Sequence, residues 1–284
     1  MSRILLPERW ERLISLLQAQ GRLSVEEIAQ RLGVSPPTVR RDLARIEARG
    51  LVQRTWGGAQ PSRWVPPGVT LAESRGVNAA EKAHIGAAAA RLVRPGECVI
   101  LDGGFTTHEL ARQLGTDDVT VVTNSLDVAR LVAGRRGPRL VMLGGELLAS
   151  SGTLVGPATQ RQLADLLADR AFLGANALSP DAGLCADMAL TAETKRAMVA
   201  AARELVVVAD HSKLGRGALY RVAPIDAVDT LVTDERADGA LLEAFRAAGV
   251  EVIVAAAADG VAAEPNDPNL DTAAGAGSVG PSPI

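Results

Sequence analysis

The segment "LGVSPPTVRRDL" at residues 32–43 combines two adjacent prolines with two adjacent arginines at what reads as the start of a helix. Counted from Ser35 as the N-cap, Pro36 and Pro37 take the first two helical positions, where backbone N–H groups have no intrahelical partner. The prolines therefore fit a helix N-terminus. The Ser35 hydroxyl is then left with the N–H of Thr38 as its partner for capping.

The residues before this segment predict two further helices. "PERWERLISLLQAQG" at 7–21 places apolar side chains at helical spacing and ends at a glycine. "SVEEIAQRLG" at 24–33 begins with Ser24 followed three residues later by Glu27, which is a capping box. Two short helices joined by a tight turn that contains glycine form a helix-turn-helix, whose second helix enters the DNA major groove.

One face of the helix at 35–49 carries the candidate DNA contacts. A rotation of about 100° per residue turns Val39, Leu43 and Ile46 inward and turns Arg41 away from them. After this helix, "LVQRTWGGAQ" at 51–60 predicts a hairpin, or wing. The alternative is a solvated charged face on an ordinary helical bundle. The residues expected to contact DNA are Ser35, Pro37, Thr38, Arg40, Arg41, Arg45 and Arg54.

Charge and composition agree with a two-part chain. Its 284 residues suggest about two domains. Residues 1–64 hold 11 Arg, no Lys and 6 acidic residues, so this head carries +5, whereas the whole chain carries −3. A basic head on an acidic body fits a module that binds a polyanion. Two cysteines are too few for a disulfide framework or a cysteine metal site, and no metal is expected. No apolar run resembles a signal peptide or a membrane span, so we expect a cytoplasmic protein.

The remaining chain predicts a parallel α/β domain. We expect a DNA-binding domain at 1–58, a linker rich in Pro, Gly and Ser at 59–76, a body at 77–256 and a disordered tail at 257–284. Within the body, short continuous apolar runs such as "CVILD" and "VTVVT" alternate with segments of helical pattern. Buried strands that alternate with helices favour a parallel sheet.

Polar or glycine-rich residues follow five of these strands. In parallel α/β sheets, ligands bind beyond the carboxyl ends of the strands. Glycine lets the backbone approach an anion, and a helix N-terminus offers free N–H groups. The five segments are "LDGGFTTHEL" (101–110), "VTNS" (122–125), "LGGE" (143–146), "GAN" (174–176) and "ADHSK" (209–213).

Lysine is rare in this chain. Only Lys82, Lys195 and Lys213 occur beside 27 Arg. A compact ammonium at these positions suggests a binding role. The alternative is that three lysines remain by chance on a solvated surface.

At this point the chain resembles a known family. The stretch 24–59, with "TVRRDL" and "RTWGGA", resembles the DNA-binding domain of the DeoR family of sugar-responsive transcriptional regulators. "EKAHIG", "LDGGFTT", "VVTNS", "LGGE", "LVGP", "AFLGA", "ETKRAM" and "VVVADHSKLG" are similar to the DeoR-type sensor domain, so the likeness covers about 3–250. It implies an N-terminal winged helix-turn-helix followed by a mostly parallel α/β sensor domain similar to ribose-5-phosphate isomerase. That domain binds phosphorylated sugars and does not convert them.

The resemblance also implies an effector site. The glycines, threonines, Asn124 and Ser125 would hold phosphate or sugar hydroxyls, Asp102 and Asn176 would bond hydroxyls, and the lysines would supply positive charge. The expected effector-binding residues are Lys82, Asp102, Gly103, Gly104, Thr106, Thr107, Asn124, Ser125, Gly144, Gly145, Asn176, Glu193, Lys195 and Lys213.

The chain departs from the family pattern at several positions. Prolines are unusual at 36 and 37, and Trp56 stands where the family usually has His. Phe105 replaces a common Thr or Ser, Asn176 replaces Asp, and Thr191 stands where an acid is often found. These departures predict a changed wing contact and an effector that differs from those of other members.

The sequence therefore predicts a sequence-specific DNA-binding transcriptional regulator, a repressor of carbohydrate-metabolism genes that is controlled by a phosphorylated sugar. Its expected partners are operator double-stranded DNA, the sugar phosphate and further copies of itself in a dimer or tetramer. No membrane contact and no cofactor are expected.

Two other functions stay open. The first is a sugar-phosphate isomerase with a DNA-binding head, in which Glu193, Asp102 and Lys195 would supply acid–base chemistry. The second and weaker one is a metal-responsive regulator, although the three histidines, His84, His108 and His211, are isolated in the sequence.

Overall fold

The computed structural model describes residues 6–47, 52–61, 64–65, 77–115 and 118–256. The predicted disordered tail lies outside these residues.

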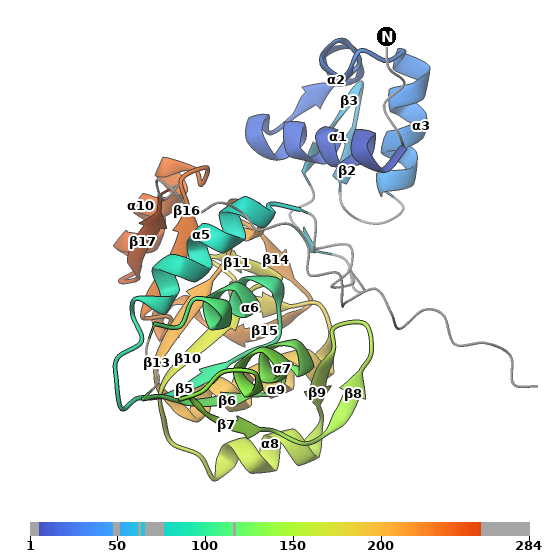
Figure 1. Cartoon of the computed structure of the whole chain (residues 1–284). Helices are drawn as coiled ribbons and strands as arrows, with labels where there is room; N and C mark the ends of the chain where they lie inside the picture. Colours follow the sequence, from blue (N-terminus) through green and yellow to red (C-terminus); the bar gives the residue numbers. More distant parts are fainter. Residues whose placement is uncertain (1–5, 48–51, 62–63, 66–76, 116–117, 257–284) are drawn as a thin grey trace, which may run out of the picture.

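The N-terminal domain contains helices and a small antiparallel sheet (Figure 1), with bounds α1 (Leu6–Gln20), β1 (Leu23–Ser24), α2 (Val25–Leu32), α3 (Pro36–Glu47), β2 (Val52–Thr55) and β3 (Gly58–Pro61). The sheet order is β1-β3-β2. Apolar side chains from the helices and the hairpin form its core, among them Leu17, Ile28, Val39, Leu43 and Ile46. The inward face predicted for α3 is therefore confirmed.

The predicted helix ends of α2 are also present. Ser24 Oγ accepts from the N–H of Glu27 at 3.2 Å, and the Glu27 carboxylate accepts from the N–H of Ser24 at 2.8 Å. Gly33 closes the helix with a φ of 65°, in the left-handed region that glycine adopts without strain. These two caps fix the turn between α2 and α3.

The second domain is built on a seven-stranded sheet (Figure 1). Its strands are β5 (Cys98–Leu101), β6 (Thr120–Thr123), β7 (Arg139–Met142), β10 (Ala168–Gly174), β13 (Ala202–Val208), β16 (Thr230–Asp234) and β17 (Glu251–Ala255). All neighbours are parallel, in the order β17-β16-β13-β10-β5-β6-β7. The apolar runs "CVILD" and "VTVVT" are β5 and β6, and the parallel sheet that such runs predict is confirmed.

Helices cover both faces of this sheet, and the longer ones are α5 (Ala79–Ala90), α6 (Phe105–Arg112), α7 (Leu126–Ala133), α8 (Pro157–Ala164), α9 (Ala189–Ala200) and α10 (Gly239–Ala247). Alternate strand residues divide between two cores. In β5, Val99 and Leu101 pack with Ile85 of α5 and Leu110 of α6, whereas Ile100 belongs to the core of the opposite face. Burial on both faces explains why the strands read as continuous apolar runs.

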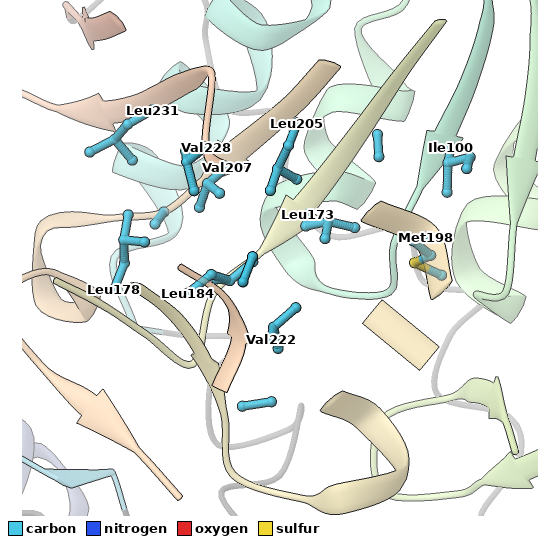
Figure 2. Packing of buried hydrophobic residues seen from close by; sticks show 14 of the residues in the cluster. Ile100, Leu173, Leu178, Leu184, Met198, Leu205, Val207, Val222, Val228 and Leu231 are labelled. Atoms are coloured by element: carbon cyan, nitrogen blue, oxygen red, sulfur yellow. The ribbon is translucent and has the colours of Figure 1, made fainter. Parts of the chain in front are cut away.

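Short elements that the sequence did not predict complete the second domain. They are β8 (Glu146–Leu148), β9 (Thr153–Val155), β11 (Ala177–Ser179), β12 (Gly183–Ala186), β14 (Gly217–Ala218), β15 (Tyr220–Ala223) and the 3₁₀ turns η1 (His211–Lys213) and η2 (Ile225–Ala227). The sheet β11-β12-β15 packs Leu178, Leu184 and Val222 toward Leu173 and Leu205 of the main sheet (Figure 2). It therefore acts as a third layer over one core.

The predicted linker at 59–76 contains two ordered stretches. Strand β3 runs to Pro61, three residues past the boundary that the sequence suggested, because Gln53 pairs with Gln60 and Val52 with Pro61. Beyond it, β4 (Trp64–Val65) pairs in parallel with β14 of the second domain. The rest of the predicted linker, 62–63 and 66–76, lies outside the described residues.

Candidate DNA interface and ligand site

Helix α3 begins at Pro36, as the cap at Ser35 predicts. The backbone carbonyl of Ser35 accepts from the N–H groups of Thr38 at 2.9 Å and Val39 at 3.1 Å. The Ser35 hydroxyl bonds the Thr38 hydroxyl at 2.9 Å, and not the N–H that the sequence left for it. The helix thus starts with two prolines, and the carbonyl of Ser35 accepts its first backbone hydrogen bonds.

The outward face of α3 is open to a ligand. Pro37, Arg41 and Arg45 are exposed and Thr38 is half-buried. Arg40 is exposed too, but its guanidinium lies 3.4 Å from Glu26 of α2. An exposed pair of this kind is weak, and a phosphate can compete for Arg40. The structure thus gathers the predicted helix residues on one basic face.

Asp42, inside the "RRDL" segment, has a structural role that the sequence analysis missed. The side chain is 2% exposed. Its carboxylate accepts two hydrogen bonds from Arg9, at 2.6 and 3.1 Å, and one from the Trp10 indole at 3.1 Å. Burial alone would raise the pKa of Asp42, but these bonds outweigh it and hold the pKa below its ordinary value. Asp42 therefore joins α3 to α1 through buried hydrogen bonds.

The wing is the β2–β3 hairpin. Arg54 is exposed, and its guanidinium lies 3.6 Å from Glu47 of α3 while its N–H donates to Glu47 at 2.9 Å. Residues Trp56 and Gly57 form the turn between the paired Thr55 and Gly58. Arg54 is thus tied to the recognition helix.

The candidate ligand site lies where the connections of the main sheet change direction. From β5 the chain passes through α6 to β6 on one side, and from β10 it leads to β13 on the other. Crevices for ligands form at such a switch point. Lys195 of α9 lies there, 5% exposed, and its Nζ donates to Asp102 after β5 and, at 2.7 Å, to the carbonyl of Gly174 at the end of β10. The ammonium of Lys195 is therefore already neutralised by Asp102.

The glycines after β5 allow a close approach of two loops. A Cβ on Gly103 would lie 2.0 Å from Cγ2 of Thr153 in β9, so only glycine fits. Gly104 is the N-cap of α6, no side chain caps this helix, and Thr106 and Thr107 in its first turn are buried. The hydroxyl of Thr107 donates to the Gly104 carbonyl at 3.0 Å. The uncapped first turn of α6 is suited to an anion.

Asn124, which follows β6, is 2% exposed. Its Nδ2 donates to the carbonyl of Leu154 at 2.9 Å, whereas its buried Oδ1 has no hydrogen-bond partner among the described residues. A buried acceptor left unpaired costs about 1–3 kcal/mol. The neighbouring Ser125 hydroxyl accepts from the N–H of Val128 and caps α7, so it has a structural function.

Charged groups gather at the end of β13. Asp210 is 1% exposed and accepts from Asn78 at 2.8 Å and from Ser212. Lys82 and Lys213 lie near this carboxylate, and together with the Ser212 bond they hold the pKa of Asp210 below its ordinary value despite burial. Burial also lowers the pKa of Lys82, with Asp210 and Glu81 opposing and Lys213 adding to the effect. Both ammonium groups thus lie near the carboxylate of Asp210.

Two neighbours extend this cluster. Lys82 Nζ lies 6.0 Å from the ring centroid of Phe105, the first residue of α6, and donates to the Val77 carbonyl at 2.7 Å. The cluster therefore reaches the uncapped start of α6. Arg216 donates to the Ser212 carbonyl at 3.2 Å, but its buried Nε has no partner within the part of the chain that the structure describes. Burial lowers the pKa of Arg216, with Asp210 opposing.

The sequence analysis missed three members of this cluster. Asp210 and Arg216 stand in or beside the quoted "ADHSK", where attention rested on Lys213. Asn78 is, among the described residues, the only non-glycine residue with positive φ, at 55°. Its side chain does not cap α5 but bonds Asp210. An Asn directly before an alanine-rich helix was the available signal.

Three predicted effector residues, Glu193, Gly144 and Gly145, are exposed and lie in other contacts. Glu193 is exposed on α9 and accepts from Gln160 at 3.2 Å, because it lies two positions from the buried Lys195 on the helix. The exposed turn of Gly144 and Gly145 is held by α8: the N–H of Gly144 donates to Gln162 at 3.1 Å, and its carbonyl accepts from Thr159 at 2.7 Å. Asn176 is half-buried after β10.

The fold and these surfaces define a winged helix-turn-helix transcriptional regulator with an α/β sensor domain. Residues 9–62 match the model of the DeoR-like helix-turn-helix domain, and residues 77–235 match that of the DeoR C terminal sensor domain. The chain belongs to the DeoR family.

Similar proteins include other regulators. The chain is 34% identical to a putative aga operon transcriptional repressor of Escherichia coli O157:H7, over 87% of this chain and 93% of that one. It is 35% identical to the regulator GlpR of Haloferax volcanii, over 90% and 98% of the two chains. It is 31% identical to the repressor GlcR of Bacillus subtilis, over 87% and 95%. The predicted family and the predicted fold class are confirmed.

Solved structures show more distant likeness. Ribose 5-phosphate isomerase A from Methanocaldococcus jannaschii aligns with a TM-score of 0.36 and 22% identity, over 48% of this chain and 55% of that chain. The translation initiation factor eIF-2B of Pyrococcus horikoshii OT3 gives a TM-score of 0.40 and 14% identity, over 80% and 86%. Scores this low support no functional comparison. Within the described residues, no helix has the length and apolar character of a membrane span.

Proposed function

We propose that the chain is a repressor whose affinity for operator DNA is controlled by a phosphorylated sugar bound at the carboxyl edge of the main sheet. The observation that carries this proposal is the buried Oδ1 of Asn124, which has no hydrogen-bond partner among the described residues. A hydroxyl of a sugar is a donor that would satisfy it. The names of similar proteins, such as the aga operon repressor, support a sugar-related role.

The phosphate would bind at the other end of the site. Lys82, Lys213 and Arg216 all lie near Asp210, and Glu81 is a second carboxylate near Lys82, so three cations face two carboxylates and this region carries an excess of positive charge. Lys82 also contacts the start of α6, whose first turn has no side-chain cap. Cations beside a free helix N-terminus suit a phosphate dianion. Lys195, which is paired with Asp102, would orient the sugar and not bind the phosphate.

The dimensions of the sheet fit a ligand of this class. Neighbouring strands lie about 4.8 Å apart, so the ends of β13 and β6, three strands apart, are separated by about 14 Å. A gap of this size leaves room for a small sugar phosphate between the two ends. The Asp102–Lys195 pair lies between the two ends.

We propose that the ligand is bound and not converted. An isomerase needs a free base next to the C–H bond that loses its proton. Asp102 is engaged by Lys195, and Glu193 is exposed and bonded to Gln160. Proton NMR in D₂O checks this point, since exchange of the proton on the carbon next to the carbonyl of a bound pentose or hexose phosphate would instead support the enzyme.

The expected assembly is a homo-oligomer that works in the cytoplasm, where the DNA is. Two heads about one helical turn of DNA apart, about 34–36 Å, read a repeated or two-fold operator. A ligand can release DNA only if it distinguishes two states of this assembly. Light scattering at several protein concentrations measures the state directly.

A thermal-shift screen tests the ligand proposal. The panel holds pentose and hexose phosphates, glycerol phosphate, the same sugars without phosphate, and inorganic phosphate. A ligand at 100 times its Kd adds about 2.7 kcal/mol to the free energy of unfolding. We expect a shift with a phosphorylated sugar and none with its unphosphorylated form.

Variants locate the site. Among the described residues, the Lys213 side chain makes no hydrogen bond and acts through its charge near Asp210, so Lys213→Ala should fold and lose the shift, and Lys213→Arg should recover part of it. Arg161→Ala, an exposed residue on α8, removes the same charge away from the site and should leave the shift unchanged. An undiminished shift in Lys213→Ala would contradict the proposed phosphate end.

A further inference from the structure

The most exposed large apolar side chain in the described part of the chain is Trp56, at 99% exposure. It lies on the N-terminal domain, at the tip of the wing. The other large apolar side chains that are exposed are between 36% and 71% exposed, and all belong to the second domain. Full exposure of an indole to water is unfavourable, because its apolar area is large. Tryptophan therefore usually packs in cores or interfaces.

The backbone holds this tip in a fixed position. The N–H of Val25 in α2 donates to the carbonyl of Gly57 at 2.9 Å, and Arg22 lies 3.5 Å from the carbonyl of Trp56. Gly57 has a φ of 81°, which glycine adopts without strain. A Cβ on Gly58 would lie 2.1 Å from the Leu23 carbonyl, so β3 and β1 touch there through glycine alone. Trp56 is thus presented on a rigid turn.

The charges around the tip favour nucleic acid as the partner. Arg22 and Arg54 are both exposed and flank Trp56 in the fold. Glu47 is the acid that pairs with Arg54, at 3.6 Å, and it belongs to the recognition helix α3. An exposed ring on a turn with two exposed arginines nearby matches a groove whose walls are phosphates and whose floor is base edges and sugars. The wing and α3 belong to one compact core, so both can reach the same DNA.

We propose that Trp56 enters the minor groove beside the bases read by α3 and packs there as an apolar wedge at a base step. Such wedges partly unstack a step and kink the duplex, and pyrimidine–purine steps such as TA and CA yield most easily. Trp56 therefore makes the protein select a flexible step in the flank of its operator, without a hydrogen bond to any base.

DNA selection from a random pool tests this inference. The full-length protein and its Trp56→Ala variant select duplexes from the same pool. Enrichment of a common sequence by the unaltered protein shows that the protein binds DNA sequence-specifically, which is a separate question from the role of Trp56. We expect both to select the same central bases, whereas only the protein with Trp56 enriches TA or CA steps in the flank. On the best duplex, Trp56→Ala should bind about tenfold more weakly, which is about 1.4 kcal/mol. Trp56→Phe should keep part of the flank preference.

Controls separate this contact from other causes. Leu167→Ala removes another exposed apolar side chain, at 71% exposure, from the second domain and should change neither affinity nor preference. Fluorine NMR of protein labelled with 5-fluorotryptophan gives a second readout, with the Trp56 signal identified by its loss in Trp56→Phe. That signal should move on addition of the selected duplex.

Three results would overturn the inference. The first is an unchanged flank preference and affinity in Trp56→Ala, and the second is a Trp56 signal that DNA does not move. The third is a Trp56 signal already shielded from solvent in the free protein, which would indicate that another part of the chain or a second copy covers it.

Discussion

Replacing Asp42 tests whether a buried ion pair holds the recognition helix in place. Its carboxylate is 2% exposed and joins α3 to Arg9 and Trp10 of α1 through three hydrogen bonds. Hydrogen bonds to a charged group contribute about 1.5–3 kcal/mol each. Arg9 keeps some exposure, at 14% of its side chain, so water recovers part of what it loses. We therefore expect Asp42→Ala to lower the free energy of unfolding of the N-terminal domain by about 2–4 kcal/mol.

The assay uses Trp10 itself as the reporter. In a full-length background with Trp56→Phe and Trp64→Phe, Trp10 is the remaining indole, and its fluorescence follows urea unfolding of this domain. Small domains have m-values of about 1–3 kcal/mol per molar urea, so a loss of about 2–4 kcal/mol should lower the midpoint by about 0.7–4 M. Asp42→Asn, which keeps an acceptor for Trp10 and loses the charge, should cost about half as much.

The matched control is Arg40→Ala, which removes the exposed partner of Glu26 at 3.4 Å. Exposed pairs of this kind contribute about 0–1 kcal/mol, so the midpoint should hardly move. If Asp42→Ala falls within about 0.5 kcal/mol of the unaltered protein, the pair does not anchor α3 and the reasoning fails.

Three further predictions follow from the same contacts. Arg41→Ala should abolish sequence-specific binding in a gel shift at moderate salt while Arg161→Ala does not, and retained affinity would remove Arg41 from the groove. Gly103→Ala should raise at least tenfold the ligand concentration needed for a given thermal shift, since its Cβ would lie 2.0 Å from Thr153. An unchanged dose response would show that the two loops can separate. Because the pKa of Asp42 is lowered on folding, its stabilisation is present above the unfolded pKa of about 3.9 and is lost as pH falls through the folded value. Urea midpoints of the N-terminal domain should therefore drop below about pH 4, and less so in Asp42→Asn.

The fold was largely predictable because its signals are local. The capping box at Ser24, the prolines after Ser35 and the apolar runs that became the seven strands all act within a few residues. The small sheet β11-β12-β15 escaped prediction because its strands are three or four residues long and become ordered only by packing on the main core.

The candidate site was only partly predictable. The strand ends indicated where Asp102 and Asn124 would lie, but the pairing of Asp102 with Lys195 joins residues 93 positions apart, and no pattern along the chain encodes it. Glu193 could have been placed correctly, since two positions on a helix point about 200° apart. The role of Asp42 as an anchor was missed because its partner Arg9 lies 33 positions away.

The short ladder between β4 and β14 limits the length of the tether between the two domains. Strand β14 begins directly after Arg216 of the proposed phosphate end. Trp64 and Val65 are therefore paired with the segment that directly follows this end of the site. While β4 is paired with β14, the chain from Pro61 to Trp64 can span at most about 10 Å. If this pairing breaks, the chain from Pro61 to Val77 can span up to about 55 Å. Two residue pairs thus decide how far the N-terminal domain can lie from the second domain.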